Sequence, residues 1–340
     1  MKWIYDLSYE MLKTEFAGAN LKKFTTDQVF QWLYFKNIQD VNLWSNISKT
    51  DRQFLESNYN TSLIGVVRAT GDEHGTRKFL LELHDKLRIE AVLIPEKHHF
   101  TFCISTQAGC PLACRFCATG LLGFKRNLTA GEIISQILVL KNEIRYYTGK
   151  LNIVLMGMGE PLLNYENLEQ ALKIMTSAKA MNISPRNITI STSGILEPLK
   201  RFEKTFPRVK ISFSLNASDD LMRETLMPIS KKEKLADILD YFRDTKLDRI
   251  HRITFEYVLL KGVNDSTQDA RKVAALLRGI PCKINVIPYN RNESLPFKTP
   301  SEQEVNAFAD YLHEKGYTVI VRWSKGKEIR SACGQLAGEE

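Results

Sequence analysis

Strand-like and helical segments alternate along most of this chain, from about residue 98 onward. The strand-like runs are rich in Ile, Val, Phe and Leu, and several are almost continuously apolar, as expected for parallel strands covered on both faces. Repetition of this strand–helix unit predicts an α/β fold, built as a barrel or as a doubly wound sheet. The predicted strands are 100–105, 152–158, 187–192, 209–215, 252–259 and 283–288, the helical segments between them include 129–147, 165–181, 231–245 and 265–277, and a helix at 301–315 and a strand at 317–322 follow. Thr129 and Glu132 form a capping-box pattern at the start of the first of these helices.

The first 95 residues have a different pattern. Helical patterns dominate at 9–16, 26–36 and 50–59, and two β-like runs follow them at 77–83 and 87–94. The chain is also longer than one typical domain. We therefore predict three parts, an accessory domain over 1–95, a barrel over 96–325 and a C-terminal tail over 326–340.

Charge and composition narrow the class of protein. The 340 residues include 47 Lys and Arg against 39 Asp and Glu, so the formal net charge is 47 − 39 = +8, which favours a polyanionic partner. With 44% hydrophobic and 25% charged residues, the composition is that of a globular protein and excludes a disordered one. No stretch approaches the roughly 18 consecutive apolar residues of a membrane span. Acidic residues near the N-terminus argue against a signal peptide, so we expect a cytoplasmic protein with no membrane partner.

Cysteines are unevenly distributed, with four of the six inside fifteen residues. The last three of that group, Cys110, Cys114 and Cys117, form a C-x3-C-x2-C run. Thiolates bind soft metals, and this spacing lets three sulfurs from one loop converge on one centre. A structural zinc site needs four ligands and the loop holds no histidine, whereas a [4Fe–4S] cluster can use three cysteines and leave one iron open. Cys103 lies in a predicted strand, and we interpret Cys282 as a small buried apolar side chain.

Polar residues gather where the predicted strands end, which in a barrel is where the active site forms. The second strand ends in Gly159 and Glu160, where a backbone can approach a ligand closely and a carboxylate can accept from an ammonium group. Other strand ends carry hydroxyls and amides that suit a ribose, a carboxylate or an adenine edge. Each segment, taken alone, is also an ordinary turn sequence. These ends contain Ser191, then Ser214, Leu215 and Asn216, and finally Asn290.

The tail carries Cys333 between small residues, downstream of Arg322, Lys325, Lys327 and Arg330. Neighbouring cations lower the pKa of a thiol and raise its thiolate fraction. From composition alone, a surface thiol in a disordered tail with solvated basic residues is the better interpretation.

Together these motifs resemble the RlmN-type radical S-adenosylmethionine (SAM) methyltransferases, which methylate adenine C2 in 23S ribosomal RNA and in transfer RNA. The C-x3-C-x2-C run, with Phe116 directly before its last cysteine, is typical of radical SAM enzymes. The resemblance implies a partial (β/α)6 barrel, open at one side, and an RNA-binding role for the mainly helical accessory domain. The matching blocks are 89–96, 105–119, 156–163, 191–194, 282–290 and 332–336.

The resemblance also implies roles for individual residues. Cys110, Cys114 and Cys117 would ligate one [4Fe–4S] cluster. Cys333 is similar to the methyl-accepting cysteine of the family, and Cys103 to the second catalytic thiol, which forms a disulfide with Cys333 as the RNA adduct is released. Glu90 matches the proton acceptor, and its place opposite the apolar stripe of its strand permits a site role. SAM would be bound by Gly159, Glu160, Ser191, Ser214, Leu215, Asn216 and Asn290.

The implied chemistry explains why two reactive thiols are needed. Adenine C2 is electron-poor and offers no lone pair, so it does not attack a sulfonium methyl group directly. In the family route one SAM methylates Cys333, and a second SAM, cleaved at the reduced cluster, supplies the radical that activates that methyl group. The implied partners are 23S rRNA, tRNA and an electron donor such as flavodoxin or ferredoxin, and we expect a monomer.

Two alternatives compete with this interpretation. The related Cfr-type enzymes methylate adenine C8, but Gly159–Pro161 and the segment 282–288 look like the C2 enzymes. A non-catalytic RNA-binding protein with a zinc knuckle would suit the net charge, yet it leaves the strand ends and the tail cysteine unexplained. One departure concerns Asn216, where the family often has histidine; asparagine can still donate and accept hydrogen bonds.

Overall fold

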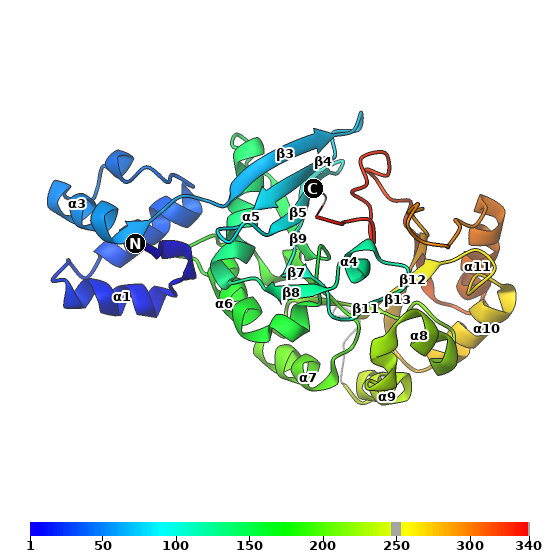
Figure 1. Ribbon diagram of the computed structural model, residues 1–340. Coiled ribbons are helices and arrows are strands. Elements are labelled where there is room, and N and C mark those ends of the chain that lie inside the picture. Colours follow the sequence, from blue (N-terminus) through cyan, green and yellow to red (C-terminus); the bar gives the residue numbers. More distant parts are fainter. Residues whose placement is uncertain (246–252, 339–340) are drawn as a thin grey trace.

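A ten-stranded sheet organises most of the chain, in the order β14-β13-β12-β11-β10-β9-β6-β5-β4-β3. The computed structural model describes residues 1–245 and 253–338. Helices surround the outside of the curved sheet, and the N-terminal helices form a smaller lobe at one end (Figure 1). The predicted α/β barrel architecture is confirmed, with β14 and β3 as the two open edges of the sheet.

Seven strands, β6 and β9 to β14, run parallel to one another, and they include every barrel strand predicted from the sequence. Most of their side chains are buried, because helices cover one face and the barrel interior receives the other. Position 252, predicted to begin the fifth strand, lies outside the described residues. The strands are β6 His99–Cys103, β9 Lys150–Leu155, β10 Ile188–Thr192, β11 Lys210–Ser214, β12 Ile253–Leu259, β13 Cys282–Pro288 and β14 Thr318–Val321.

The covering helices begin with α5 Ala130–Glu143, whose predicted capping box is present. The Thr129 hydroxyl accepts a hydrogen bond from the Glu132 backbone, and the Glu132 carboxylate accepts one from the Thr129 backbone. The capping box therefore fixes where the helix begins. The remaining helices are α6 Tyr165–Thr176, α7 Leu196–Thr205, α8 Asp220–Leu226, α9 Leu235–Asp244, α10 Thr267–Leu276 and α11 Glu302–Glu314.

Three antiparallel strands extend the sheet beyond β6. They are β3 Gly65–Gly71, β4 Arg77–Glu82 and β5 Arg88–Pro95, and β5 pairs directly with β6. The predicted division near residue 95 stays a prediction, and the sheet runs continuously across it. Strand β3 had no sequence signal, because nearly all of its side chains are exposed and it is held by backbone pairing to β4.

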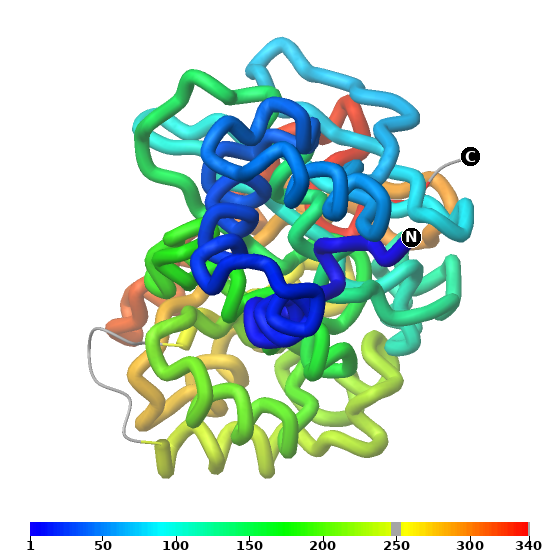
Figure 2. Tube along the Cα trace, turned by 90° about the vertical axis from the view of Figure 1, so that its left-hand side faces the viewer, coloured from blue at the N-terminus to red at the C-terminus, as the bar shows by residue number. Residues whose placement is uncertain are grey.

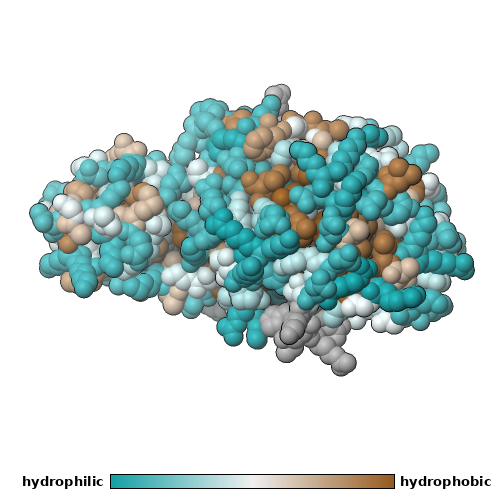
Figure 3. Space-filling model, turned by 90° about the horizontal axis from the view of Figure 1, so that it is seen from below, coloured by the Kyte–Doolittle hydropathy of each residue, from teal (hydrophilic) through white to brown (hydrophobic). Residues whose placement is uncertain are grey.

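The N-terminal lobe contains α1 Tyr9–Gly18, α2 Thr25–Phe30 and α3 Lys49–Asn58, with a π-helical turn Gln31–Phe35 after α2 and a two-strand pair, β1 Lys2–Trp3 with β2 Tyr59–Asn60. In Figure 2 this lobe lies in front of the barrel. It packs on α5, where a Cβ on Gly131 would lie 2.8 Å from the Tyr5 backbone, so only glycine permits the approach. Hydrophilic side chains dominate the face seen in Figure 3, with apolar patches between them.

Candidate active site

The three clustered cysteines lie on a loop between two short paired strands, β7 Gln107–Gly109 and β8 Phe124–Asn127, and the short helix α4 Ala118–Leu121 follows Cys117. The Cys110 backbone donates to the Gly123 carbonyl at 3.1 Å, which closes the base of the loop. Gly109 has a φ of +75°, and a Cβ there would overlap the Gly123 oxygen. The loop is thus held shut at a position that only glycine can occupy.

The thiols of the loop form a donor set that fits a cationic centre. Burial, together with the charges of Glu160 and Cys117, raises the pKa of Cys110 to about 12. Burial also raises the pKa of Cys114 well above its ordinary value, with contributions from the Cys117 and Cys110 charges. Three thiolates that repel one another in a desolvated site need positive charge to stabilise them, and an iron–sulfur cluster supplies it. Among the described residues, no three His, Cys, Asp or Glu side chains converge as ligands of a single metal ion.

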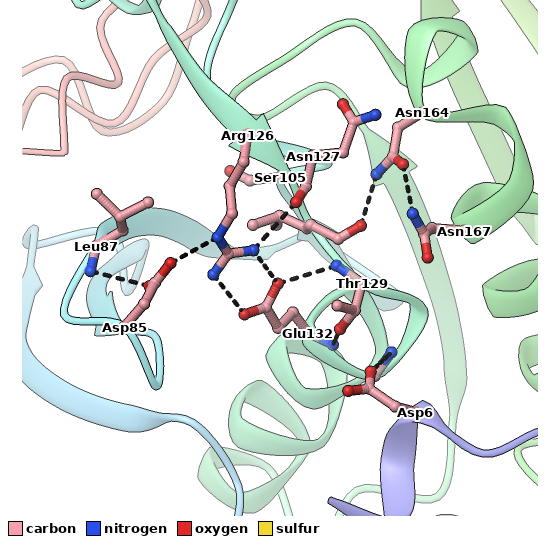
Figure 4. Close-up of polar contacts among 12 residues, drawn as sticks. Asp6, Asp85, Leu87, Ser105, Arg126, Asn127, Thr129, Glu132, Asn164 and Asn167 are labelled. Carbon is pink, nitrogen blue, oxygen red and sulfur yellow. Dashed lines mark hydrogen bonds and ion pairs between the residues drawn. The ribbon is translucent and has the colours of Figure 1, made fainter.

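Arg126 ties this loop to the surrounding fold (Figure 4). Its guanidinium lies between two carboxylates, donating to Asp85 at 2.6 Å and to both oxygens of Glu132 at 2.7 and 2.8 Å. Asp85 belongs to the β4–β5 turn and Glu132 to the capping box of α5. Arg126, on β8, therefore joins the ribbon beneath the cysteine loop to both elements.

Glu160 is buried where β9 and β10 end, as predicted, and both of its carboxylate oxygens accept backbone hydrogen bonds. Ser193 donates to one at 2.8 Å and Leu162 to the other at 3.1 Å. Burial raises the pKa of Glu160, and these hydrogen bonds oppose the shift. Gly159 has a φ of +104°, and a Cβ there would lie 2.6 Å from the Gln107 side chain. The Gly159–Glu160 turn is packed tightly against the strand that leads into the cysteine loop.

The next strand ends meet as the sequence predicts. The hydroxyls of Ser191 on β10 and Ser214 on β11 are 3.5 Å apart. Asn216 has a φ of +54°, its side-chain oxygen accepts from the Val258 backbone at 2.9 Å, and its amide donates to the Met227 sulfur at 3.4 Å. Asn216 thus has a structural role at the β11–β12 junction.

Arg223 completes this wall of the site and was missed by sequence reasoning. Its guanidinium is fully buried and donates to the backbone carbonyls of Ser193, Ser214 and Leu215 at 2.8–3.1 Å. Burial lowers the pKa of Arg223 to about 10, and the Cys114 charge acts in the opposite direction. No motif marks it, because an arginine in a short helix is usually exposed.

The tail is ordered against the cysteine loop, contrary to what its composition indicates. The Ala118 backbone of α4 donates to the Gly334 carbonyl at 2.8 Å, and the Thr119 hydroxyl donates to the Leu336 carbonyl at 2.7 Å. The Asn290 amide donates to the Cys333 carbonyl at 3.2 Å and to the Ser324 hydroxyl at 3.0 Å. Cys333 is therefore an exposed thiol on a fixed backbone, held beside Cys117 by the helix that follows it.

Besides Cys117, the groups Cys103, Glu256 and Arg322 lie within electrostatic reach of Cys333. Cys103, buried at the end of β6, has a pKa that is raised by burial and by the Cys333 charge. Although the Cys333 residue is accessible to solvent, the protein groups packed around its thiol partly desolvate it and raise its pKa, as do the charges of Glu256 and Cys117, while Arg322 lowers it. Both thiols are free. Cys282 is buried in β13, which confirms its assignment to the core.

Glu256 is a second residue that sequence reasoning missed. It is buried on β12, where the Asn285 amide donates to Oε1 at 2.9 Å, while Oε2 has no hydrogen-bond partner within residues 1–245 and 253–338. Burial raises the pKa of its carboxyl. An acid inside the apolar run of a predicted strand was a visible signal that the sequence analysis did not use.

Comparison with known proteins decides the family. The Radical SAM superfamily profile matches residues 104–274, and the profile described as "Ribosomal RNA large subunit methyltransferase N-terminal domain" matches residues 2–60. A protein of Desulfosudis oleivorans named "Dual-specificity RNA methyltransferase RlmN" is 41% identical over 94% of this chain and 86% of its own length. A protein of the same name from Geobacter sulfurreducens is 40% identical over 99% of this chain and 92% of its own length. The chain belongs to the RlmN family of radical SAM methyltransferases.

A solved member of the wider class supports the same conclusion. The crystal structure of a radical SAM methyltransferase from Sphaerobacter thermophilus superposes with a TM-score of 0.95 at 36% identity, and all of both chains is covered. RlmN-family membership makes the chain a SAM-dependent methyltransferase with a partial (β/α)6 barrel, and it excludes the non-catalytic zinc-knuckle alternative. None of the described helices is long and apolar enough to cross a membrane.

Glu90, the proton acceptor implied by the RlmN resemblance, is fully buried on β5. Its backbone carbonyl accepts from the Ser105 hydroxyl at 2.6 Å, and the same hydroxyl accepts from the Met158 backbone at 2.8 Å. Its carboxylate contacts the C-terminal tail and Lys78, a buried lysine that sequence reasoning also missed.

Proposed function

We propose that this RlmN-family enzyme methylates adenine C2 in 23S ribosomal RNA, at the peptidyl transferase centre, and in transfer RNA, at the adenosine next to the anticodon. The carrying observation is the placement of Cys333. Its thiol is exposed on an ordered tail, its backbone is bound through α4 to the loop of Cys117, and its charge influences the pKa of Cys103. A methyl-carrying thiol must reach the substrate and lie near both a cofactor and a second catalytic thiol, and this placement of Cys333 supports its proposed role.

The donor groups described above support the cofactor assignment. Cys110, Cys114 and Cys117 would hold one [4Fe–4S] cluster with an iron open to SAM, and Gly159, Glu160, Ser191, Ser214, Leu215, Asn216 and Asn290 would surround SAM. The Asn290 side-chain oxygen is buried without a partner in the described residues, so it is available to a ligand donor. When bound and reduced, this pair of cofactors supplies an organic radical that can abstract hydrogen.

The remaining steps belong to the protein's own side chains. Cys333 gives up its proton and takes a methyl group from one of two SAM molecules used per turnover. The organic radical would take one hydrogen atom from the methyl group, and the resulting carbon bonds to adenine C2. One electron then leaves the adduct, for which the oxidised cluster would be the acceptor, and Glu90 accepts the proton that leaves C2. Cys103 then attacks the Cys333 sulfur, so that an S–S bond forms and the sulfur–carbon bond breaks, its electron pair remaining with the RNA product, which takes up a proton. Two electrons from a thiol reductant restore both cysteines.

The cellular setting follows from this chemistry. The substrates are RNAs, so we expect the enzyme to act in the cytoplasm. Separately, we expect it to be a monomer. A low-potential protein such as flavodoxin or ferredoxin would deliver electrons to the cluster.

Cysteine variants test the proposed roles. Cys103→Ala should accumulate a covalent protein–RNA adduct, because nothing attacks the Cys333 sulfur. Cys333→Ala should form neither the adduct nor a methylated cysteine. Cys282→Ala is the matched control, since this thiol is buried in β13, and it should retain turnover. Adducts are measured by denaturing gel and cysteine methylation by peptide mass spectrometry. Normal 2-methyladenosine production by Cys333→Ala would refute the proposal.

A further inference from the structure

A buried ion pair joins strands β4 and β5. The Lys78 ammonium is 2.9 Å from Oε1 of Glu90, and the two side chains are 6% and 0% exposed. Desolvating two charges costs more than their attraction usually returns, so a fully buried pair is weak evidence for stability. Its presence at this position therefore points to another role.

The ion pair contacts both ends of the tail segment that carries Cys333. The Lys78 ammonium donates to the Arg330 carbonyl at 3.3 Å, three residues before the cysteine. Oε2 of Glu90 accepts from the backbone of Ala337 at 2.7 Å and of Gly338 at 3.1 Å, beyond the cysteine. A Cβ on Gly338 would lie 3.1 Å from the Arg88 carbonyl, so this end of the segment is seated closely on β5.

We propose that Lys78 is a positioning residue for Cys333. It acts in two ways, binding the start of the segment directly and holding Glu90 as a paired carboxylate that binds the end. The middle of the segment is bound by Asn290 and by α4, and the Lys78–Glu90 pair supplies contacts at both of its ends. The proposal rests on the proposed role of Cys333 as the methyl acceptor.

Removal of the ammonium should release both ends. Without Lys78, the Glu90 carboxylate is buried with no partner charge at Oε1, and its orientation toward the tail is no longer fixed from that side. The bonds that Oε2 accepts from Ala337 and Gly338 should therefore weaken. The Arg330 carbonyl loses its donor at the same time.

The test compares two lysines of one hairpin in the full-length, cluster-loaded enzyme. Lys78→Met removes the buried ammonium, and Lys86→Met removes an exposed one, which pairs with Glu82 at 2.8 Å and is 79% exposed. Hydrogen exchange of the peptide containing Ala337 and Gly338 should accelerate at least about tenfold in Lys78→Met and stay unchanged in Lys86→Met. The initial rate of Cys333 methylation should fall with it, and Lys78→Arg should restore part of both.

A second variant keeps the test decisive if the first folds poorly. Lys78→Met combined with Glu90→Met removes both charges, leaves neither unpaired and should fold. It should still lose protection at residues 337–338. Wild-type exchange of these amides in either variant, or undiminished Cys333 methylation in Lys78→Met, would overturn the proposal. If the wild-type enzyme itself forms no methylated Cys333, the proposed function fails. The exchange data would still show whether Lys78 and Glu90 hold the two ends of the tail segment.

Discussion

Asn216 shows how a residue beside a cofactor site can be determined by backbone geometry. Its φ of +54° lies in the left-handed region, where asparagine, aspartate and histidine are enriched among residues with a side chain. Its amide group also joins β11 to β12 through the Val258 backbone. The histidine common in the family at this place and the asparagine here share tolerance of this conformation and the ability to accept a hydrogen bond.

Replacement of Asn216 should therefore affect stability more than catalytic chemistry. We expect Asn216→Ala to lower the free energy of unfolding by about 1–3 kcal/mol, because the buried Val258 N–H loses its acceptor and alanine strains the backbone. Asn216→His should cost less. Urea denaturation of both variants measures the difference, and an alanine variant as stable as the parent would contradict this account.

At the level of single residues, the rarer side-chain types of the site could be singled out from the sequence, and the common ones could not. The three loop cysteines could be singled out as candidate ligands because few side chains bind soft metals, whereas Cys333 was singled out only through the resemblance to the RlmN family, and these roles stay predictions. Arg223 and Lys78 could not be singled out, because lysines and arginines are common and nearly always exposed. Only the tertiary structure shows these two as fully enclosed cations that bind backbone carbonyls.

Among elements, the β7–β8 ribbon depends on Arg126. The Arg126 guanidinium lowers the pKa of Asp85, chiefly through their hydrogen bond. A carboxyl whose pKa is lower in the folded state contributes stability above its unfolded value of about 3.9, and this contribution is lost as the pH falls through the folded value.

Arg126→Gln should lower the free energy of unfolding at neutral pH by about 1–3 kcal/mol, because charge-assisted bonds to Asp85 and Glu132 are lost. The variant should also lose less stability than the parent between neutral pH and pH values below the ordinary aspartate range. Urea unfolding of parent and variant, at neutral pH and at one pH below the ordinary aspartate range, measures both the stability loss and its pH dependence. An equal acid-induced loss in the two proteins would show that Asp85 does not depend on Arg126.

Helices and strands were predictable where burial of one face or of the whole element produces a recognisable apolar pattern in the sequence. The barrel strands β6 and β9 to β13 are mostly apolar runs, and α5 is marked by its capping box. Strand β3 and the short helix α8 left no such pattern, since β3 is almost wholly exposed and α8 spans only Asp220–Leu226.

For the whole molecule, the net charge of +8 bears on RNA docking. Basic groups that contact phosphates release counterions, so the logarithm of the RNA affinity should fall linearly with the logarithm of salt concentration, by about 0.7 per neutralised phosphate on single strands. Filter binding or anisotropy with a transfer RNA across a salt series measures the slope. Affinity independent of salt would contradict an electrostatic contribution.

The long-range arrangement could not be predicted from the sequence. Strand order in the barrel follows chain order, which the repeated strand–helix pattern already indicates. The tail, however, returns to the β4–β5 hairpin. Lys78 contacts Arg330 across a sequence separation of 252 positions, and Glu90 contacts Ala337 across one of 247. Backbone groups form most of these contacts, and backbone groups leave no sequence signature.

The central claim is transfer of a methyl group to adenine C2 through Cys333. Its most direct test is mass spectrometry of nucleosides from 23S ribosomal RNA and transfer RNA after incubation with the cluster-loaded enzyme, SAM and a reductant. We predict 2-methyladenosine from the parent enzyme and none from Cys333→Ala. Formation of 8-methyladenosine, or of 2-methyladenosine by Cys333→Ala, would contradict the account.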